Sequence, residues 1–304
     1  MWIYIFLIVV LLCIVIIIQF NIDIRRSYER LNKYDFKTIN TEYGKANYFV
    51  EGEGDSILIS HGIFGGYDQG YVSLKGLVGE NYKKISVSRF GYVGSDLPQN
   101  PTPENQAKVF KEILDELNIE KTYVITTSAG GAAGIRFAID FPERTKGLIL
   151  LSSGCPSIKK TKEEIKQMGM MGPPSLFVND FPMWFCMKYF SFIFNSMMGS
   201  KVNTEQLFDT MLPVKPRRAG IMADTNITNI DMMLNYDDYS IENIKAPVLV
   251  IHAKDDPMAK YEDIQKFISR INPEKAIFDT GGHLISGHGE EINNCIIQFI
   301  NSTK

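Results

Sequence analysis

The chain has 304 residues, of which 45% are hydrophobic and 22% charged, a globular composition with room for one large domain or two small ones. Its net charge of -3, without any stretch that interleaves basic residues with aromatics, argues against a nucleic-acid partner. Its four cysteines are scattered without a CxxC pair, so neither a disulfide framework nor a zinc site is predicted.

The first twenty residues, MWIYIFLIVVLLCIVIIIQF, contain no charged side chain. At about 1.5 Å per residue, a helix of this length spans roughly 30 Å, the thickness of the hydrocarbon core of a bilayer. A buried core helix is the alternative, but it would normally carry a polar stripe. A cleaved signal peptide would need a basic start and a small-residue cleavage site, which are missing. We therefore predict a transmembrane anchor over residues 1–20.

Basic residues follow this segment and none precedes it. Arg25, Arg26, Arg30 and Lys33 lie in the stretch 21–36, which we interpret as a linker. Because positive charge collects on the cytoplasmic side of a membrane, the rest of the chain is expected there. The alternative is that the bias is accidental, since acidic residues are also present in the same linker.

From residue 37 onward, apolar strands alternate with helices. Strands that are apolar throughout, such as 57–60 and 246–253, are typical of a parallel sheet covered on both faces. The helix within 102–119 has Thr102 as its predicted N-cap and its apolar residues on one face. We predict an α/β fold with a mostly parallel sheet and helices on both faces. Further strands are expected at 83–88, 122–127, 146–153 and 275–282.

The alternation stops after residue 154 and resumes at about residue 241. The intervening residues 155–240, called the lid below, have helical patterns without strands. An insertion between two strands lies outside the core, usually over one end of the sheet. The core is therefore expected in two parts, 37–154 and 241–304.

Small residues surround one serine in the stretch VITTSAGGAAG. Ser128 stands between a predicted strand and a predicted helix, and a sharp turn there needs small neighbours to expose the hydroxyl of a nucleophile. Thr126 occupies a position where glycine is usual, which weakens the T-x-S-x-G pattern. Alternatively, Gly130 and Gly131 only allow the helix to pack closely on the sheet, with Ser128 inert. The pattern alone leaves both interpretations open.

A nucleophilic serine needs a base and an acid to orient it. Of the four histidines, His283 follows an apolar strand and two glycines, which favours it as the base over His288, five residues later. His252, at the end of a strand, is interpreted as a core imidazole. Asp256 and Asp255 follow another buried strand, where catalytic groups gather in parallel sheets; we choose Asp256 as the acid and Asp255 as a structural neighbour.

The order Ser128, Asp256, His283 resembles the α/β-hydrolase superfamily. SHGIFGG resembles its oxyanion loop, SRFGYVGSDLP its motif after the next strand, and EEINNCIIQFI its last helix. The similarity covers about 48–153 and 244–300. It implies the α/β-hydrolase fold with a helical lid, and an oxyanion hole formed by the backbone amides of Ile63 and Ala129.

The resemblance implies a serine hydrolase that works through an acyl-enzyme and needs no metal or organic cofactor. The lid is rich in methionine and aromatic residues between 168 and 194. Flexible and flat apolar side chains suit an acyl or alkyl group, so a small-molecule ester, with lipid esters included, is the expected substrate. Two alternatives stay open: a thioesterase or peptidase-like hydrolase of the same fold, and a non-catalytic binding or signalling protein that keeps the scaffold.

Overall fold

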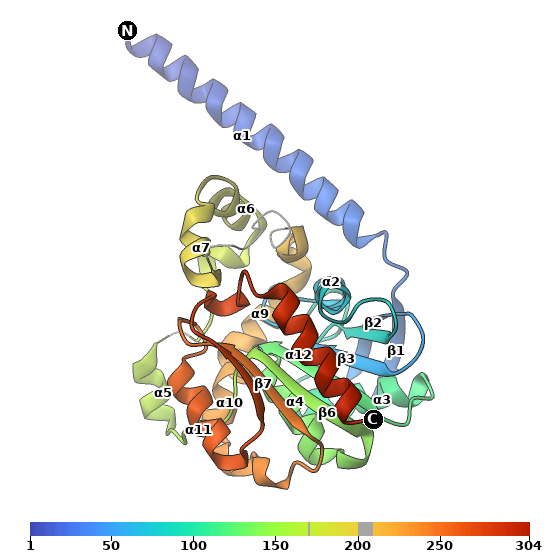
Figure 1. Ribbon diagram of the computed structural model, residues 1–304. Coiled ribbons are helices and arrows are strands. Elements are labelled where there is room, and N and C mark those ends of the chain that lie inside the picture. Colours follow the sequence, from blue (N-terminus) through green and yellow to red (C-terminus); the bar gives the residue numbers. More distant parts are fainter. Residues whose placement is uncertain (170, 200–208) are drawn as a thin grey trace.

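The computed structural model describes residues 1–169, 171–199 and 209–304, and an eight-stranded sheet forms its centre (Figure 1). The strands lie in the order β1-β2-β4-β3-β5-β6-β7-β8. Within this sheet β2 alone runs against the others, because it pairs antiparallel with β1 and β4 while all other pairs are parallel. The strands are β1 Lys37–Thr41, β2 Gly44–Glu51, β3 Ser56–Ser60, β4 Lys83–Val87, β5 Thr122–Ser128, β6 Thr145–Ser153, β7 Val248–Ala253 and β8 Glu274–Phe278.

Helices cover both faces of the sheet, as the sequence predicted. Successive side chains of the central strands alternate between two apolar clusters: Ile57 and Ile59 face one, and Leu58 faces the other. Helices α2 and α12 pack on the first face, and α3, α4 and α11 on the second. Their bounds are α2 Tyr67–Val78, α3 Pro103–Glu116, α4 Gly131–Asp140, α11 Tyr261–Ile271 and α12 Gly289–Ser302.

Local signals set where these elements begin. The Thr102 side chain accepts a hydrogen bond from the Asn105 amide, which confirms it as the N-cap of α3. Strand β7 begins at Val248, two residues later than expected. Pro247 precedes that start and has no amide hydrogen to give to the ladder.

The lid leaves the core after β6 and returns before β7. Its described residues form helices and tight turns, without a strand. The helices are α5 Lys162–Met168, α6 Asp180–Tyr189, α7 Ser191–Met198, α9 Arg218–Ala223 and α10 Asn229–Leu234. A π-helical turn, Asp224–Thr228, joins α9 to α10, and single turns lie at Ser175–Val178, Lys215–Arg217 and Tyr236–Asp238. Another turn, Ile241–Asn243, follows the lid.

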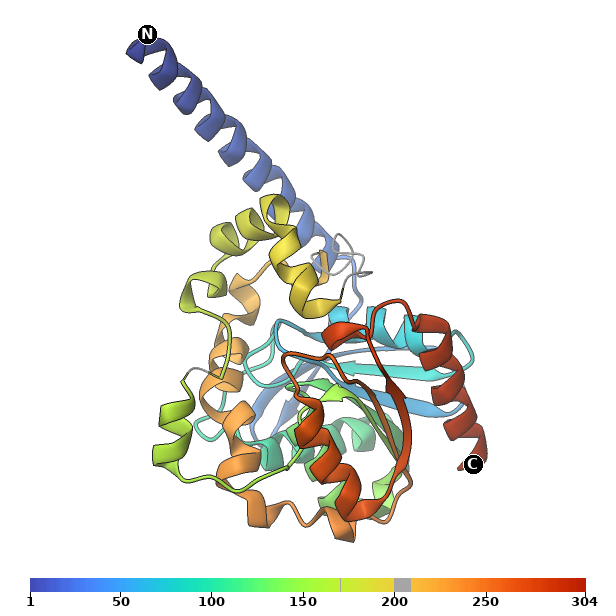
Figure 2. The ribbon, with the colours of Figure 1, turned by 60° about the vertical axis from the view of Figure 1, so that its left-hand side comes forward.

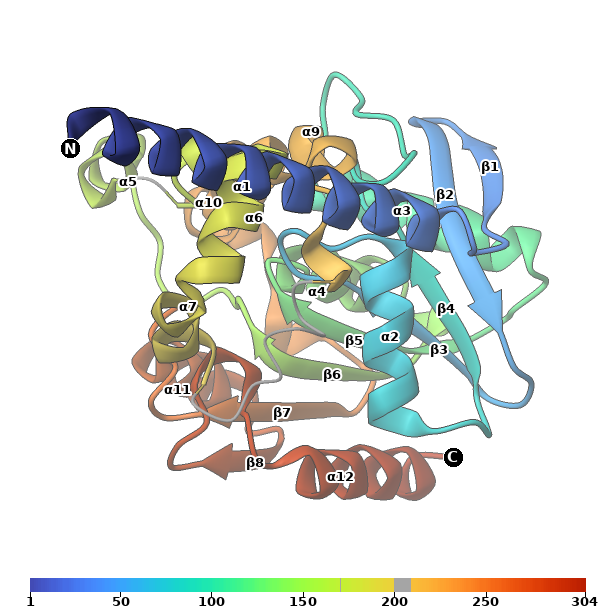
Figure 3. The same ribbon diagram turned by 90° about the horizontal axis from the view of Figure 1, so that it is seen from above.

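Helix α1, Trp2–Leu31, projects away from the core (Figure 1). In the described part of the chain it is the one helix long and apolar enough to span a membrane, judged by length and composition. It continues past residue 20 to Leu31, so most of the predicted linker is helical. Its second half lies beside α6 of the lid, in views from the side and from above (Figures 2 and 3).

Candidate active site

Ser128 occupies the turn between β5 and α4. Its φ of 50° lies in the left-handed region, which is strained for a residue with a side chain. The turn is possible because Gly130 and Gly131, two and three residues after Ser128, have no side chains. A Cβ on Gly130 would stand 2.1 Å from the Ser60 carbonyl oxygen, and one on Gly131 would stand 2.1 Å from that of Gly154. These two glycines let α4, which begins at Gly131, start against the strand ends three residues after Ser128.

Thr126 fits at the glycine position for two reasons. Its buried hydroxyl lies 2.9 Å from Ser153 Oγ, so the polar atom has a partner. Its methyl group points to Gly134 on α4, where a Cβ would approach Thr126 Cγ2 to 2.1 Å. The bulk that the strand gains at Thr126 is therefore matched by a missing side chain on the facing helix.

Asp256 and His283 form a buried pair. His283 Nδ1 lies 2.8 Å from Asp256 Oδ2, and both side chains are almost fully buried. Burial alone would raise the pKa of Asp256, but hydrogen bonds from His283 and from the amides of Met258 and Ala259 bring the pKa below its ordinary value. The ionised carboxylate therefore accepts a proton held on Nδ1. This tautomer leaves Nε2 of His283 with a lone pair, as a general base requires.

Asp255 and His288 do not belong to the Asp256–His283 pair and contact other groups. The carboxylate of Asp255 accepts the amides of Gly281 and Gly282, at 3.1 and 2.9 Å, and so holds the loop that carries His283. His288 Nδ1 lies 3.3 Å from the Glu291 carboxylate, and its ring packs on Phe278.

His252 is a buried imidazole, as the sequence predicted. Its Nε2 donates to the carbonyl of Ala259 at 2.8 Å, and its buried Nδ1 has no partner in the described part of the chain. Burial lowers the pKa of this ring, which therefore stays neutral.

The loop after β3 lies against Ser128. A Cβ on Gly62 would come within 3.1 Å of Ser128 Cβ. His61 fixes this loop: its Nε2 accepts the Arg89 amide, so Nδ1 carries the proton and donates to the Gly62 carbonyl at 2.7 Å. Among the described residues, the amides of Ile63 and Ala129 donate to no acceptor. Both are therefore available to an oxyanion.

Two buried arginines connect this loop to the lid, and sequence reasoning missed both. Arg89 donates to both oxygens of Asp224, at 2.7 and 2.6 Å, and to the His61 carbonyl. Arg217 binds Asp68 through both of its terminal nitrogens and donates to the Gly65 carbonyl at 2.7 Å. The partners are 135 residues apart in the first pair and 149 in the second, so no local sequence pattern predicts either ion pair.

Ser128 is the last residue of β5, and Asp256 and His283 follow β7 and β8, so all three lie at the edge of the sheet where the parallel strands end. In the described part of the chain Ser128 Oγ makes no hydrogen bond; such contacts often tighten only when substrate binds. The lid reaches this edge, because a Cβ on Gly282 would stand 2.7 Å from the Gly199 amide nitrogen. The described residues contain no group of three or more His, Cys, Asp or Glu placed to hold a metal.

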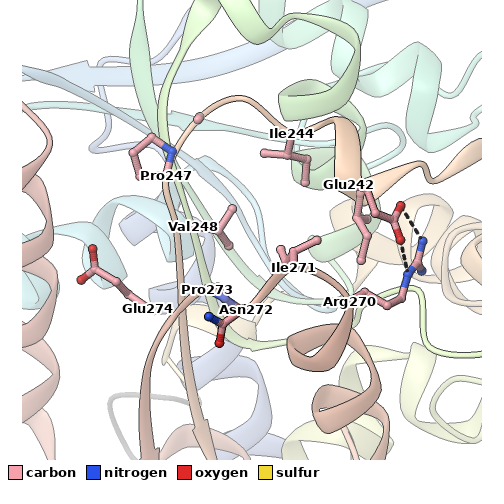
Figure 4. Close-up of a pocket in the computed structure, with 11 residues that line it drawn as sticks. Glu242, Ile244, Pro247, Val248, Arg270, Ile271, Asn272, Pro273 and Glu274 are labelled. Atoms are coloured by element: carbon pink, nitrogen blue, oxygen red, sulfur yellow. Dashed lines mark hydrogen bonds and ion pairs between the residues drawn. The ribbon is translucent and has the colours of Figure 1, made fainter.

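A cavity of about 490 Å³ lies at the opposite edge (Figure 4). It opens where β7 and β8 begin, and the ion pair of Arg270 with Glu242 forms one side of it. None of the candidate catalytic residues lines it.

The chain is similar to several proteins that are described as hydrolases. Residues 55–181 match the family model described as alpha/beta hydrolase fold. The chain is 36% identical over 119 residues to the uncharacterized hydrolase YcgS of Bacillus subtilis, covering 38% of this chain and 41% of that protein. It is 25% identical over 260 residues to a 2-hydroxy-6-oxononadienedioate/2-hydroxy-6-oxononatrienedioate hydrolase of Paraburkholderia phymatum, covering 81% and 87% of the two chains.

Several of these alignments are partial. Those with YcgS and with two 2-hydroxy-6-oxo-acid hydrolases span only 41% to 44% of the relatives' length. The naproxen esterase of Bacillus subtilis is similar in structure, with a TM-score of 0.65, 19% identity, and coverage of 92% of this chain and 98% of that one. At that identity the likeness shows the fold.

Proposed function

The chain belongs to the α/β-hydrolase superfamily, and on that premise we propose that it is a membrane-anchored serine hydrolase that cleaves carboxylic esters with an apolar acyl or alkyl part. The observation that carries the proposal is the buried hydrogen bond between Asp256 and His283 at the sheet edge where Ser128 stands in a left-handed turn. Strain at a functional turn and a carboxylate-oriented imidazole are both needed by an activated serine.

In the proposed mechanism, His283 Nε2 takes the proton of Ser128 Oγ as that oxygen attacks the ester carbonyl. The amides of Ile63 and Ala129 bind the resulting oxyanion, and Asp256 stabilises the imidazolium. The bond to the alcohol breaks, and the alcohol leaves with the proton from His283. Water then attacks the acyl-enzyme, giving its proton to His283, which returns it to Ser128 as the acid leaves.

The apolar substrate is supported by the lid core. Met183, Trp184 and Met187 are buried together with Phe64, which directly follows Ile63 in the oxyanion loop. The surroundings of the loop are therefore apolar, which favours an acyl or alkyl chain over a charged group.

Hydrolysis of a carbon–carbon bond is a second candidate, because several relatives are named as 2-hydroxy-6-oxo-acid hydrolases. A nonadienedioate carries two carboxylates and needs cationic partners. Arg89 and Arg217 are already paired with Asp224 and Asp68. We therefore expect apolar esters to be cleaved with a higher kcat/KM than dienedioates. A panel with thioesters, peptide amides and acyl esters of increasing length tests the substrate class.

The test of the activated serine is covalent labelling of the full chain in detergent with a fluorophosphonate probe. We expect labelling that is lost in Ser128→Ala and falls about 10³-fold or more in rate in His283→Ala and Asp256→Asn. The histidine and aspartate variants each have a matched control. His288→Ala should label like the parent chain, and Asp255→Asn should lose far less than Asp256→Asn, because Asn keeps one oxygen for the glycine amides.

Labelling that persists in Ser128→Ala would show that Ser128 is not the nucleophile. If His288→Ala rather than His283→Ala lost labelling, the base would be misassigned. A folded parent chain that never reacts, with soluble and with vesicle-borne probes, would leave the non-catalytic interpretation as the better one.

A further inference from the structure

The lid carries exposed apolar side chains beside helix α1. They come from α6, from α7 and from the residue between these helices, and Phe192 is the most exposed of them at 66%. We call this set the lid surface: Phe181, Tyr189, Phe190, Phe192 and Ile193. Exposed apolar groups clustered in this way mark an interaction site more often than chance exposure does.

The lid surface is continuous with α1. Phe20 of α1 packs edge-on against Phe181 and Trp184 of α6, with ring centroids 5.2 and 5.4 Å apart. Polar groups join the same two helices. Asp23 accepts from Trp184 Nε1 and Lys188 Nζ, and the Tyr189 hydroxyl donates to Gln19. Helix α6 is thus fixed beside α1 at the level where its apolar stretch ends (Figures 2 and 3).

The charge pattern agrees with a lipid neighbour. Between residues 175 and 199 only Asp180 and Lys188 are charged. Asp180 accepts the Val214 and Lys215 amides, and Lys188 pairs with Asp23, so both charges are engaged within the protein. Tryptophan, tyrosine and lysine also gather at the level of lipid headgroups in membrane proteins.

We propose that the lid surface enters the lipid bilayer at the headgroup boundary, beside the spanning helix α1. This inference rests on the membrane anchor in the proposed function. A bilayer is the occupant that fits, because α1 crosses it at the same level and holds α6 against its own end. The lid surface also leads to the site, since Gly199 at the end of α7 packs against the loop of His283.

The test is photo-cross-linking of the full chain in vesicles of phosphatidylcholine and phosphatidylglycerol. The photoreactive residue p-benzoyl-phenylalanine replaces Phe192, Val10 or Glu120 in turn. Phe192 is on the lid surface, Val10 reports the anchor itself, and Glu120 is exposed at the opposite edge of the sheet. We expect lipid adducts at Val10 and at Phe192, at about ten times the level at Glu120 for an interfacially inserted side chain.

If Val10 gives lipid adducts but Phe192 gives no more than Glu120 does, the proposed insertion of the lid surface is wrong and the membrane anchor is still supported. If Val10 gives no lipid adducts, the proposed membrane anchor is wrong, and so is the insertion of the lid surface that depends on it. Adducts from Phe192 to a protein, in place of lipid, would show a protein partner and also overturn the proposal. Fluorophosphonate labelling of the same samples reports the serine separately, so a failed hydrolase and a failed membrane surface are told apart.

Discussion

At the scale of single residues, Thr126 shows how a departure from a motif is accommodated. A bulky residue two positions before the nucleophile would push α4 away from the strand. Gly134 leaves the space for its methyl group, and Ser153 gives its hydroxyl a partner. The two positions therefore act as a pair. Glycine inside a helix is by itself unfavourable, so Gly134 is explained only by the space that Thr126 needs.

We predict that Gly134→Ala destabilises the chain by about 1–3 kcal/mol, because its Cβ would meet Thr126 Cγ2. Thr126→Gly removes that contact, so the double variant should be more stable than the sum of the two single effects by about 1–2 kcal/mol. Urea unfolding in detergent measures both. Gly76→Ala in α2 is the control: nothing lies within 4 Å of its Cβ, and helix propensity should make it slightly stabilising. Additive effects at 126 and 134 would contradict the pairing.

At the scale of elements, one buried cluster joins α1, α2 and the lid. Asp68, in the first turn of α2, binds Arg217 of the lid and Arg30 of α1, each at 2.7 Å from its Oδ2. Burial would raise the pKa of Asp68, but the two guanidinium groups keep the pKa below its ordinary value. Arg217 also donates to the Gly65 carbonyl, so the end of α1, the lid and the loop after β3 are connected through one carboxylate.

Asp68→Asn is expected to destabilise the folded chain by about 3–5 kcal/mol, because it leaves the buried Arg217 without a counter-charge. Thermal unfolding in detergent should show a melting temperature lower by roughly 10 °C. Glu104→Gln removes the half-exposed pair with Lys108 and serves as the control, at under about 1 kcal/mol. Equal shifts in the two variants would show that the cluster contributes no more than a surface pair.

The stability difference between the parent chain and Asp68→Asn should depend on pH, and the lowered pKa of Asp68 gives the direction. A carboxyl whose folded pKa is lowered stabilises the fold above its unfolded pKa of about 3.9, and this stability is lost as pH falls through the folded value. The stability gap between the parent chain and Asp68→Asn should therefore be constant from about pH 5 to 8 and shrink below about pH 4. A gap that widens on acidification would contradict the lowered pKa.

At the scale of the whole molecule, α1, the lid and the candidate site share one end. The lid packs against α1 on one side and against the His283 loop on the other. The strand ends that carry Ser128 and Asp256 therefore face the membrane side of the proposed arrangement, and the cavity lies at the opposite edge of the sheet. Arg25 and Arg26 stand exposed on α1 just beyond its apolar stretch.

These exposed charges predict the orientation of the chain. We predict that the domain lies on the cytoplasmic side, so a green fluorescent protein fused after Lys304 should fluoresce and alkaline phosphatase at the same point should be inactive. The matched variant carries three lysines after Met1 together with Arg25→Gln and Arg26→Gln, and it should raise phosphatase activity several-fold. Active phosphatase on the unaltered chain would reverse the assignment.

The sequence by itself determined the elements whose cause is local. Uniformly apolar strands, the Thr102 cap and the small residues around Ser128 each depend on neighbours in the chain, so the sheet, its helices and the strand-to-helix turn were predictable. The choice of His283 over His288 was an expectation from its position after a strand and two glycines, and Asp256 was chosen over Asp255 on the expectation that only one of two adjacent aspartates is catalytic. Only the folded structure shows that Asp256 is hydrogen-bonded to the His283 ring, whereas Asp255 accepts a backbone amide of the loop that carries His283.

Tertiary structure alone decided the remaining features. Thr126 with Gly134, Arg89 with Asp224, Arg217 with Asp68, and α6 with α1 are contacts between residues far apart in sequence or on different elements. No periodicity or propensity encodes such pairs, because a buried charge or a missing side chain has meaning only once its partner is in place. The sequence determined which elements form, and packing determined which of them hold the lid, the anchor and the candidate site together.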